Sequence, residues 1–136
     1  MPMNSDPALP DPYSRDNSRR VLVVDDKPDE GDLLGILLEL GGHQVRVVAS
    51  AREALAAAGE LRPEVALIDI GLPDMNGYDL TRALRAQPEL KGCRFIAVTG
   101  HSSPSAVARS IAAGFESHLS KPVNVDELLA VIAGRN

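Results

Sequence analysis

The chain has 136 residues, of which 44% are hydrophobic and 3% aromatic, and its formal net charge at pH 7 is −5. This length accommodates one ordinary domain, and the shortage of aromatic side chains requires an aliphatic core. The acidic balance argues against nucleic acid as a primary ligand, because a phosphate backbone is bound by a basic surface.

The first residues of the chain differ in composition from the rest. Proline, serine, asparagine and aspartate dominate residues 1–18, which predicts a flexible tail ahead of a single domain at 19–136. The tail lacks the apolar segment of a signal peptide, and no run in the chain approaches the length of a membrane span. Cys93 is the only cysteine, so we expect no internal disulfide and a cytoplasmic location.

Short aliphatic runs alternate with helical patterns after the tail. The runs predict strands at residues 20–25, 44–49, 65–69, 94–99 and 117–120. Helices are predicted by apolar faces and by capping residues. They comprise a face over 33–40 ended by Gly41–Gly42, a helix begun by the capping box of Ser50 and Glu53, a helix at 77–86 capped by Asn76, a helix from Ser103–Pro104 to Gly114, and a helix at 125–133 after Asn124.

Five such strand–helix units predict an α/β fold. Continuous aliphatic strands are typical of a parallel sheet that is buried on both faces, so we expect a doubly wound five-stranded sheet with five helices. The flavodoxin-like strand order 2-1-3-4-5 is the natural expectation for five units. Its switch point lies between the first and third strands, at the carboxyl edge where ligands bind.

Reactive side chains follow the strands at this edge. Asp25 ends the first strand, Asp26 follows it, and Asp69 ends the third. Adjacent carboxylates repel one another unless a cation compensates, and the oxygen ligands of these three residues suit Mg²⁺. An alternative for Asp26 is that it caps the following helix. Thr99 ends the fourth strand and Lys121 follows the fifth, which adds a hydroxyl and an ammonium to the same edge.

This set of side chains suits a magnesium-assisted phosphoryl transfer. Asp69 can attack phosphorus and become an acyl phosphate, while Lys121 supplies a fixed positive charge for the transferred oxygens. We expect a cis peptide bond before Pro122. Phosphorylation would add about one negative charge at Asp69, and the hydroxyl of Thr99 would then move toward it, as a two-state switch requires.

The motifs resemble those of a known family, the receiver domains of two-component response regulators. The matching stretches are residues 21–26, 69–77, 97–100, 113–115 and 121–123, so the resemblance covers about residues 20–133. It implies a CheY-like fold in which Asp69 accepts a phosphoryl group from a histidine kinase or a histidine phosphotransfer protein.

The resemblance also assigns roles to the other residues of the edge. It implies that Asp26 and Asp69 bind Mg²⁺ directly, that Asp25 binds it mainly through water, and that the carbonyl of Gly71 completes the ligands. Thr99 and Lys121 would hold the phosphoryl oxygens. Such a protein catalyses only its own phosphorylation and dephosphorylation.

Three positions concern switching and the lifetime of the phosphoryl group. His118 stands where the family commonly has Tyr or Phe; it is either a surface histidine on an edge strand or a ring that moves inward with Thr99. Gly71 and His101 lie two residues beyond Asp69 and Thr99, where receivers tune phosphoryl lifetime. Gly71 has no side chain to position water, whereas His101 is either a donor to the phosphoryl group or solvated.

The expected output is a protein contact. We expect a downstream target to bind the face made by the fourth helix, fifth strand and fifth helix, with phosphorylation-dependent dimerisation as a further option. The chain is expected to be a stand-alone receiver, or else the receiver portion of a longer hybrid histidine kinase. Neither DNA contact nor membrane association is expected.

Competing functions leave different signatures in the sequence. A flavodoxin needs a Ser/Thr/Gly-rich phosphate loop and aromatic residues against its flavin, whereas this chain has Asp25–Asp26 at that position. An aspartyl-phosphate phosphatase needs a second acid two residues after the nucleophile, where this chain has Gly71. A receiver fold that acts as an interaction module independently of phosphorylation remains an alternative.

Overall fold

The computed structural model describes residues 18–100 and 103–134, so the predicted tail lies outside the described residues except for Ser18. Its sheet has the strand order β2-β1-β3-β4-β5, and every neighbouring pair is parallel. The predicted fold class and strand order are confirmed. The strands are β1 (Arg20–Val24), β2 (Gln44–Val48), β3 (Val65–Asp69), β4 (Arg94–Thr99) and β5 (Ser117–Ser120).

The central strands are aliphatic because both of their faces are covered. All five residues of β3 are buried, as are Val21 to Val24 of β1. The register pairs Val24 with Ile68 and Asp69 with Val98, so β1, β3 and β4 end at nearly the same level. Residues that follow these strands therefore emerge together at one edge of the sheet.

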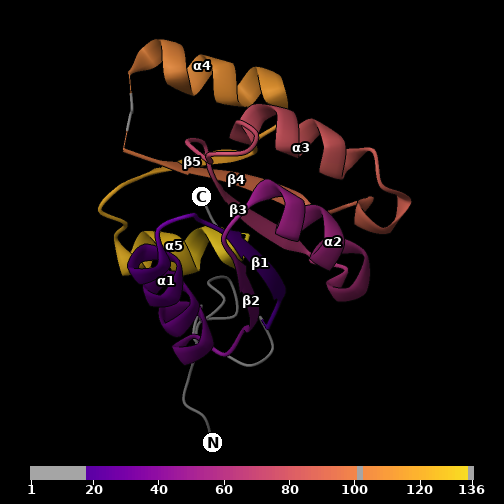
Figure 1. Ribbon diagram of the computed structural model, residues 1–136. Coiled ribbons are helices and arrows are strands. Elements are labelled where there is room, and N and C mark those ends of the chain that lie inside the picture. Colours follow the sequence, from indigo (N-terminus) through magenta and orange to yellow (C-terminus); the bar gives the residue numbers. More distant parts are fainter. Residues whose placement is uncertain (1–17, 101–102, 135–136) are drawn as a thin grey trace, which may run out of the picture.

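Two helical layers enclose the sheet. The helices are α1 (Pro28–Leu40), α2 (Ala51–Leu61), α3 (Gly77–Arg85), α4 (Pro104–Ala113) and α5 (Val125–Ile132). Helices α1 and α5 cover one face of the sheet, and α2, α3 and α4 lie on the other (Figure 1). Alternate residues of each strand supply the two cores: Val21 and Val23 pack with the α1–α5 layer, whereas Leu22 and Val24 pack with the opposite layer.

Capping side chains begin four of the helices, as predicted. The side-chain oxygens of Ser50, Asn76, Ser103 and Asn124 each accept the backbone N–H of the residue three positions later. Each bond satisfies an N–H that has no partner inside its helix, which explains the start positions of α2, α3, α4 and α5. No helix within the described ranges is both long enough and apolar enough to cross a membrane.

Besides one-residue shifts at the ends of β2, α3 and α5, three local features differ from the sequence-based expectations. Helix α1 begins at Pro28, ahead of the expected apolar face, because proline fits the first turn of a helix. Strand β1 ends at Val24 rather than at residue 25, since the Asp25 carboxylate accepts the N–H of Lys27 at 2.9 Å and turns the chain toward α1. A short 3₁₀ turn at Pro88–Leu90 was not predicted.

Arg94 ties the last elements together at the amino end of the sheet. Its guanidinium donates to both oxygens of Glu116, with a shortest distance of 2.6 Å, and to the carbonyls of Val131 and Ile132 at the end of α5. The hydrogen bond from Arg94 lowers the pKa of Glu116. One cation thus stabilises a helix end and the start of β5.

Helix α4 is the least buried helix of the α2–α3–α4 layer. Only Ser110 and Ala113 of α4 are buried. Arg109 of this helix lies 4.4 Å from the ring centroid of Tyr78 on α3, and that ring packs edge-on against Phe115 at 6.3 Å between centroids. The attachment of α4 therefore depends on few contacts, including this cation–π pair.

Candidate functional site

Three carboxylates meet at the carboxyl edge of the sheet. Asp25 and Asp26 follow β1 and Asp69 ends β3, and each offers an oxygen within 4.8 Å of the other two. Asp25 is only 2% exposed and Asp69 is 7% exposed. The level ends of β1 and β3 bring the predicted residues together, and oxygen donors in this arrangement suit a hard divalent cation.

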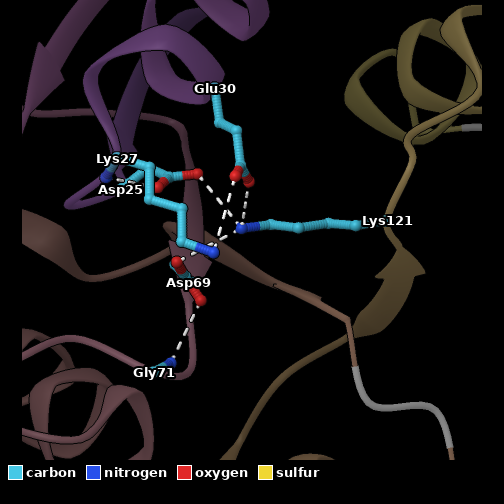
Figure 2. Close-up of polar contacts among 6 residues, drawn as sticks. All are labelled: Asp25, Lys27, Glu30, Asp69, Gly71 and Lys121. Carbon is cyan, nitrogen blue, oxygen red and sulfur yellow. Dashed lines mark hydrogen bonds and ion pairs between the residues drawn. The ribbon is translucent and has the colours of Figure 1, made fainter.

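Lys121 reaches this cluster from the loop after β5. Its Nζ lies 3.3 Å from Asp69 Oδ2, 3.4 Å from Asp25 Oδ2 and 2.6 Å from Glu30 Oε1. Figure 2 shows these three carboxylates, which include Glu30 but not Asp26, around the Lys121 ammonium. A lysine ammonium has three N–H donors. All three therefore face carboxylates.

Burial and charge act against each other in this cluster. Burial raises the pKa of Asp25, although the N–H of Lys27 and the nearby Lys121 both favour its charged form. Burial alone would lower the pKa of Lys121, but the hydrogen bond to Glu30 and the charges of Asp69 and Asp25 raise it above its ordinary value. The hydrogen bond from Lys121 lowers the pKa of Glu30. The site therefore holds a permanently charged ammonium among more carboxylates than it can neutralise.

The start of α1 decides between two interpretations of Asp26. Lys27, not Asp26, is the N-cap residue of α1, and its side chain makes no capping hydrogen bond. The alternative of Asp26 as the helix cap is therefore wrong. Asp26 is left half-buried within the carboxylate cluster, in a position to serve as a ligand.

The loop after Asp69 is held by backbone contacts on both sides. Gly71 N–H donates to Asp69 Oδ1 at 3.0 Å, and Asp74 accepts the N–H groups of Ala51 and Arg52 at the start of α2 at 3.0 and 3.1 Å. These bonds lower the pKa of Asp74. At Gly77 a Cβ would come within 2.8 Å of the backbone of the preceding turn. This tight turn and the Asp74 contact fix the loop that begins at Asp69.

Thr99 lies at the same edge, at the end of β4. It is 5% exposed and lies opposite Ser120 of β5 in the sheet register. The N–H of Lys121 donates to the carbonyl of Thr99 at 2.9 Å, and the Lys121–Pro122 peptide bond is cis. The backbone thus places Thr99 and Lys121 next to each other beside Asp69.

Of the predicted switch and lifetime residues, Gly71 contacts Asp69 directly, whereas His118 lies on the strand next to α4. His118 is half-buried on the edge strand β5, with Nδ1 3.5 Å from Ser110 Oγ of α4. Its Nε2 is buried and has no hydrogen-bond partner among the described residues. His101 lies outside the described residues. The switching role of His118 and the lifetime roles of Gly71 and His101 stay predictions.

Sequence reasoning missed the groove beside Lys121. The groove has a volume of about 510 Å³. Its lining combines charged side chains with apolar side chains of α1 and of the loop after β5; the lining is Asp25, Lys27, Glu30, Leu33, Leu34, Leu37, Gly100, Lys121, Pro122 and Val123. Glu30 was missed because an acid in a first helical turn is ordinary. The signal that could have found it is its position just after Asp25–Asp26, which places it near the ligand edge.

Comparisons with known proteins agree on one family. Residues 21–133 match the family model of the response regulator receiver domain. The chain is 35% identical over 117 residues to the DNA-binding response regulator MtrA of Mycolicibacterium smegmatis, covering 86% of this chain and 50% of MtrA. It is 35% identical over 119 residues to the protein PilH of Pseudomonas aeruginosa, covering 85% of this chain and 98% of PilH. The chain thus spans about half the length of its MtrA relatives.

Solved structures agree with this match. The chemotaxis protein CheY4 of Vibrio cholerae superposes with a TM-score of 0.80 at 31% identity, covering 86% of this chain and 98% of CheY4. A CheY-like receiver domain protein of Methanospirillum hungatei superposes with a TM-score of 0.77 at 36% identity, covering 85% of this chain and 91% of that one.

Proposed function

This chain belongs to the response regulator receiver domain family, and from that premise we propose that it accepts a phosphoryl group on Asp69 in a two-component or phosphorelay pathway of the cytoplasm. The donor is a phosphohistidine on a histidine kinase or a histidine phosphotransfer protein, and Mg²⁺ is the cofactor. The observation that carries the proposal is the cluster of Asp25, Asp26 and Asp69 within 4.8 Å, with Lys121 in contact with two of them.

The residues of the cluster fit a magnesium ion. Burial raises the pKa of Asp25, so the Lys27 N–H and Lys121 compensate its negative charge only in part. Every ligand atom that the three carboxylates offer is an oxygen, as Mg²⁺ prefers. Asp26 and Asp69 would bind the ion directly, Asp25 would bind mainly through water, and the carbonyl of Gly71 would complete the protein ligands. When bound, the ion supplies positive charge for the phosphoryl oxygens.

The transfer step uses the chain's own carboxylate as nucleophile. An Asp69 oxygen forms a bond to phosphorus while the bond from phosphorus to the donor's imidazole nitrogen breaks. The electron pair of the broken bond stays on that nitrogen, which then takes a proton from water. Lys121, whose Nζ is 3.3 Å from Asp69, holds the phosphoryl oxygens, and the hydroxyl of Thr99 donates to one of them.

The output follows from the charge that phosphorylation adds. A phosphorylated Asp69 carries about one more negative charge than the free carboxylate, which draws Thr99 toward it and lets the ring of His118 move inward. His118 lies 3.5 Å from Ser110 of α4, so its movement changes the face formed by α4, β5 and α5. A downstream protein, or a second copy of the chain, would bind that altered face.

The mass of the intact protein tests the proposal. Incubation with acetyl phosphate and Mg²⁺ is expected to add one phosphoryl group, and EDTA is expected to prevent it. Asp69→Asn is expected to keep the fold and remain unmodified; stable modification of this variant would identify another acceptor. If acetyl phosphate has no effect, a phosphorylated histidine phosphotransfer protein is used as donor, and failure with both would favour the phosphate-independent interaction module.

A further inference from the structure

Glu30 is the carboxylate closest to Lys121. The distance from Lys121 Nζ is 2.6 Å to Glu30 and 3.3 Å to Asp69. Glu30 comes from the first turn of α1, and its side chain is 39% exposed and lines the groove. Figure 2 shows Glu30 above the ammonium and Asp69 below it.

The Glu30 contact matters because a lysine ammonium can donate only three hydrogen bonds. Three carboxylates already occupy the three N–H donors of Lys121. Holding a phosphoryl oxygen requires Lys121 to release at least one of them. Asp25 and Asp69 belong to the phosphorylation site itself, whereas Glu30 stands outside the carboxylate cluster, so Glu30 is the partner that competes with the incoming group.

We propose that Glu30 is a positioning residue that occupies Lys121 in the resting protein and must release it before the phosphoryl group is held. Glu30 thereby slows phosphorylation by small anionic donors. This inference rests on the proposed function and goes beyond it by adding regulation of the same site.

Lys27 is a second cation with which the Glu30 carboxylate can pair after it releases Lys121. Lys27 Nζ lies 3.6 Å from Oε2 of Glu30, while Lys121 contacts Oε1. The exchange needs only a side-chain movement, because the backbone of α1 is held in place. A Cβ at Gly31 would lie 3.0 Å from Val47 of β2, so α1 packs closely on the sheet next to Glu30.

The kinetic test measures the rate constant of phosphorylation by acetyl phosphate in excess Mg²⁺. Glu30→Gln is expected to react about three- to tenfold faster than the unaltered protein, as for removal of a partly exposed charge pair. Asp29→Asn is the matched control, because it removes the same charge from an exposed side chain of the same helical turn. Its rate is expected within about twofold of the unaltered protein. A Glu30→Gln rate no faster than that of Asp29→Asn would overturn the proposal.

Glu30→Asp separates release of Lys121 from simple repulsion of the donor. Aspartate keeps the negative charge but is one methylene too short to keep the 2.6 Å contact. Release of Lys121 therefore predicts a faster reaction for Glu30→Asp as well, whereas donor repulsion alone predicts an unchanged rate and would overturn the proposal.

A readout without phosphorylation tests the contact itself. The ¹⁵Nζ resonance of Lys121 in the magnesium-free protein is expected to shift in Glu30→Gln and to stay unchanged in Asp29→Asn. An unchanged resonance in Glu30→Gln would show that the pair does not form. If the contact is present but neither acetyl phosphate nor a phosphorylated histidine phosphotransfer protein phosphorylates the unaltered protein or any variant, the proposed function has failed. That result differs from equal rates in all variants, which would overturn only the role of Glu30.

Discussion

Arg94 with Glu116 and Lys121 with Glu30 form ion pairs of the same length, 2.6 Å, at opposite ends of the sheet. The guanidinium of Arg94 faces one carboxylate and two carbonyls that end α5, so its charge and its donors are matched. The ammonium of Lys121 faces three carboxylates, so negative charge remains in excess around it.

The comparison separates structural from functional charges. Distance does not distinguish the two pairs, but charge balance does. A matched pair stabilises the folded chain, whereas an unmatched cluster keeps affinity for a further cation or for a change of partner. The same removal of one cation should therefore lower stability at one end of the sheet and reactivity at the other.

The largest expected effect is on the reaction. Lys121→Gln removes the ammonium that would hold the phosphoryl oxygens, so phosphorylation by acetyl phosphate should slow about 100-fold, as for other fixed donors to a transferred group. Radiolabel incorporation over time measures this rate. A rate within twofold of the unaltered protein would place Lys121 with Arg94 among the structural cations.

The next effect is on stability at the other end. Arg94→Ala leaves Glu116 and two carbonyls of α5 without their charged donor, so the free energy of unfolding should fall by about 2 kcal/mol. Urea denaturation measures it. Arg82→Ala is the control, because its pair with Asp79 is 60% and 59% exposed and should contribute less than about 1 kcal/mol. Equal losses in both variants would contradict the structural role of Arg94.

Magnesium should stabilise the folded protein through the cluster of Asp25, Asp26 and Asp69 and should not affect the Arg94–Glu116 pair. At ten times its dissociation constant, Mg²⁺ should raise the free energy of unfolding by about 1.4 kcal/mol. Asp25→Asn should be more stable than the unaltered protein without Mg²⁺, because it removes a buried surplus charge, and should gain less from Mg²⁺. Urea denaturation with EDTA and then with Mg²⁺ measures both; an equal gain in Asp25→Asn would exclude Asp25 from the site.

The smallest effect is on pH dependence, where the two clusters have opposite signs. The pKa of Glu116 is lowered from 4.5, so its contribution is present above that pH and is lost as the pH falls through the lower folded value. The pKa of Asp25 is raised from 3.8, so metal-free protein gains stability at this residue as the pH falls. Each effect should be below about 1 kcal/mol.

Comparison with Glu116→Gln and Asp25→Asn across pH 3 to 7 isolates each contribution. At pH 7 the free energy of unfolding of the unaltered protein should be above that of Glu116→Gln and below that of Asp25→Asn. Both differences should shrink as the pH falls toward 3. Parallel curves for the two variants would remove the distinction between the clusters.

Much of the fold follows from local chemistry that the sequence displays. Ser50, Asn76, Ser103 and Asn124 cap their helices through contacts within four residues, which makes those boundaries predictable. Continuous aliphatic strands predict the parallel sheet, and the sheet then places Asp25, Asp69 and Lys121 at one edge.

What the sequence could not predict depends on contacts between distant segments. Glu30 is an ordinary first-turn acid until the fold brings Lys121 within 2.6 Å. Asp74 lies in a loop, and its bonds to the N–H groups that begin α2 arise only from tertiary packing. Side-chain reach and the fit of loops against helices decide both, and neither has a periodicity in the sequence.

The contact between Arg109 and Tyr78 makes the absorbance of Tyr78 sensitive to the position of α4. The chain has no tryptophan and two tyrosines, of which Tyr13 lies outside the described residues. Tyr78 is 7% exposed and has the Arg109 guanidinium of α4 4.4 Å from its ring centroid. Displacement of α4 would remove this cation from the chromophore, so the ultraviolet absorbance and circular dichroism of a Tyr13→Phe chain would follow α4 without any attached label.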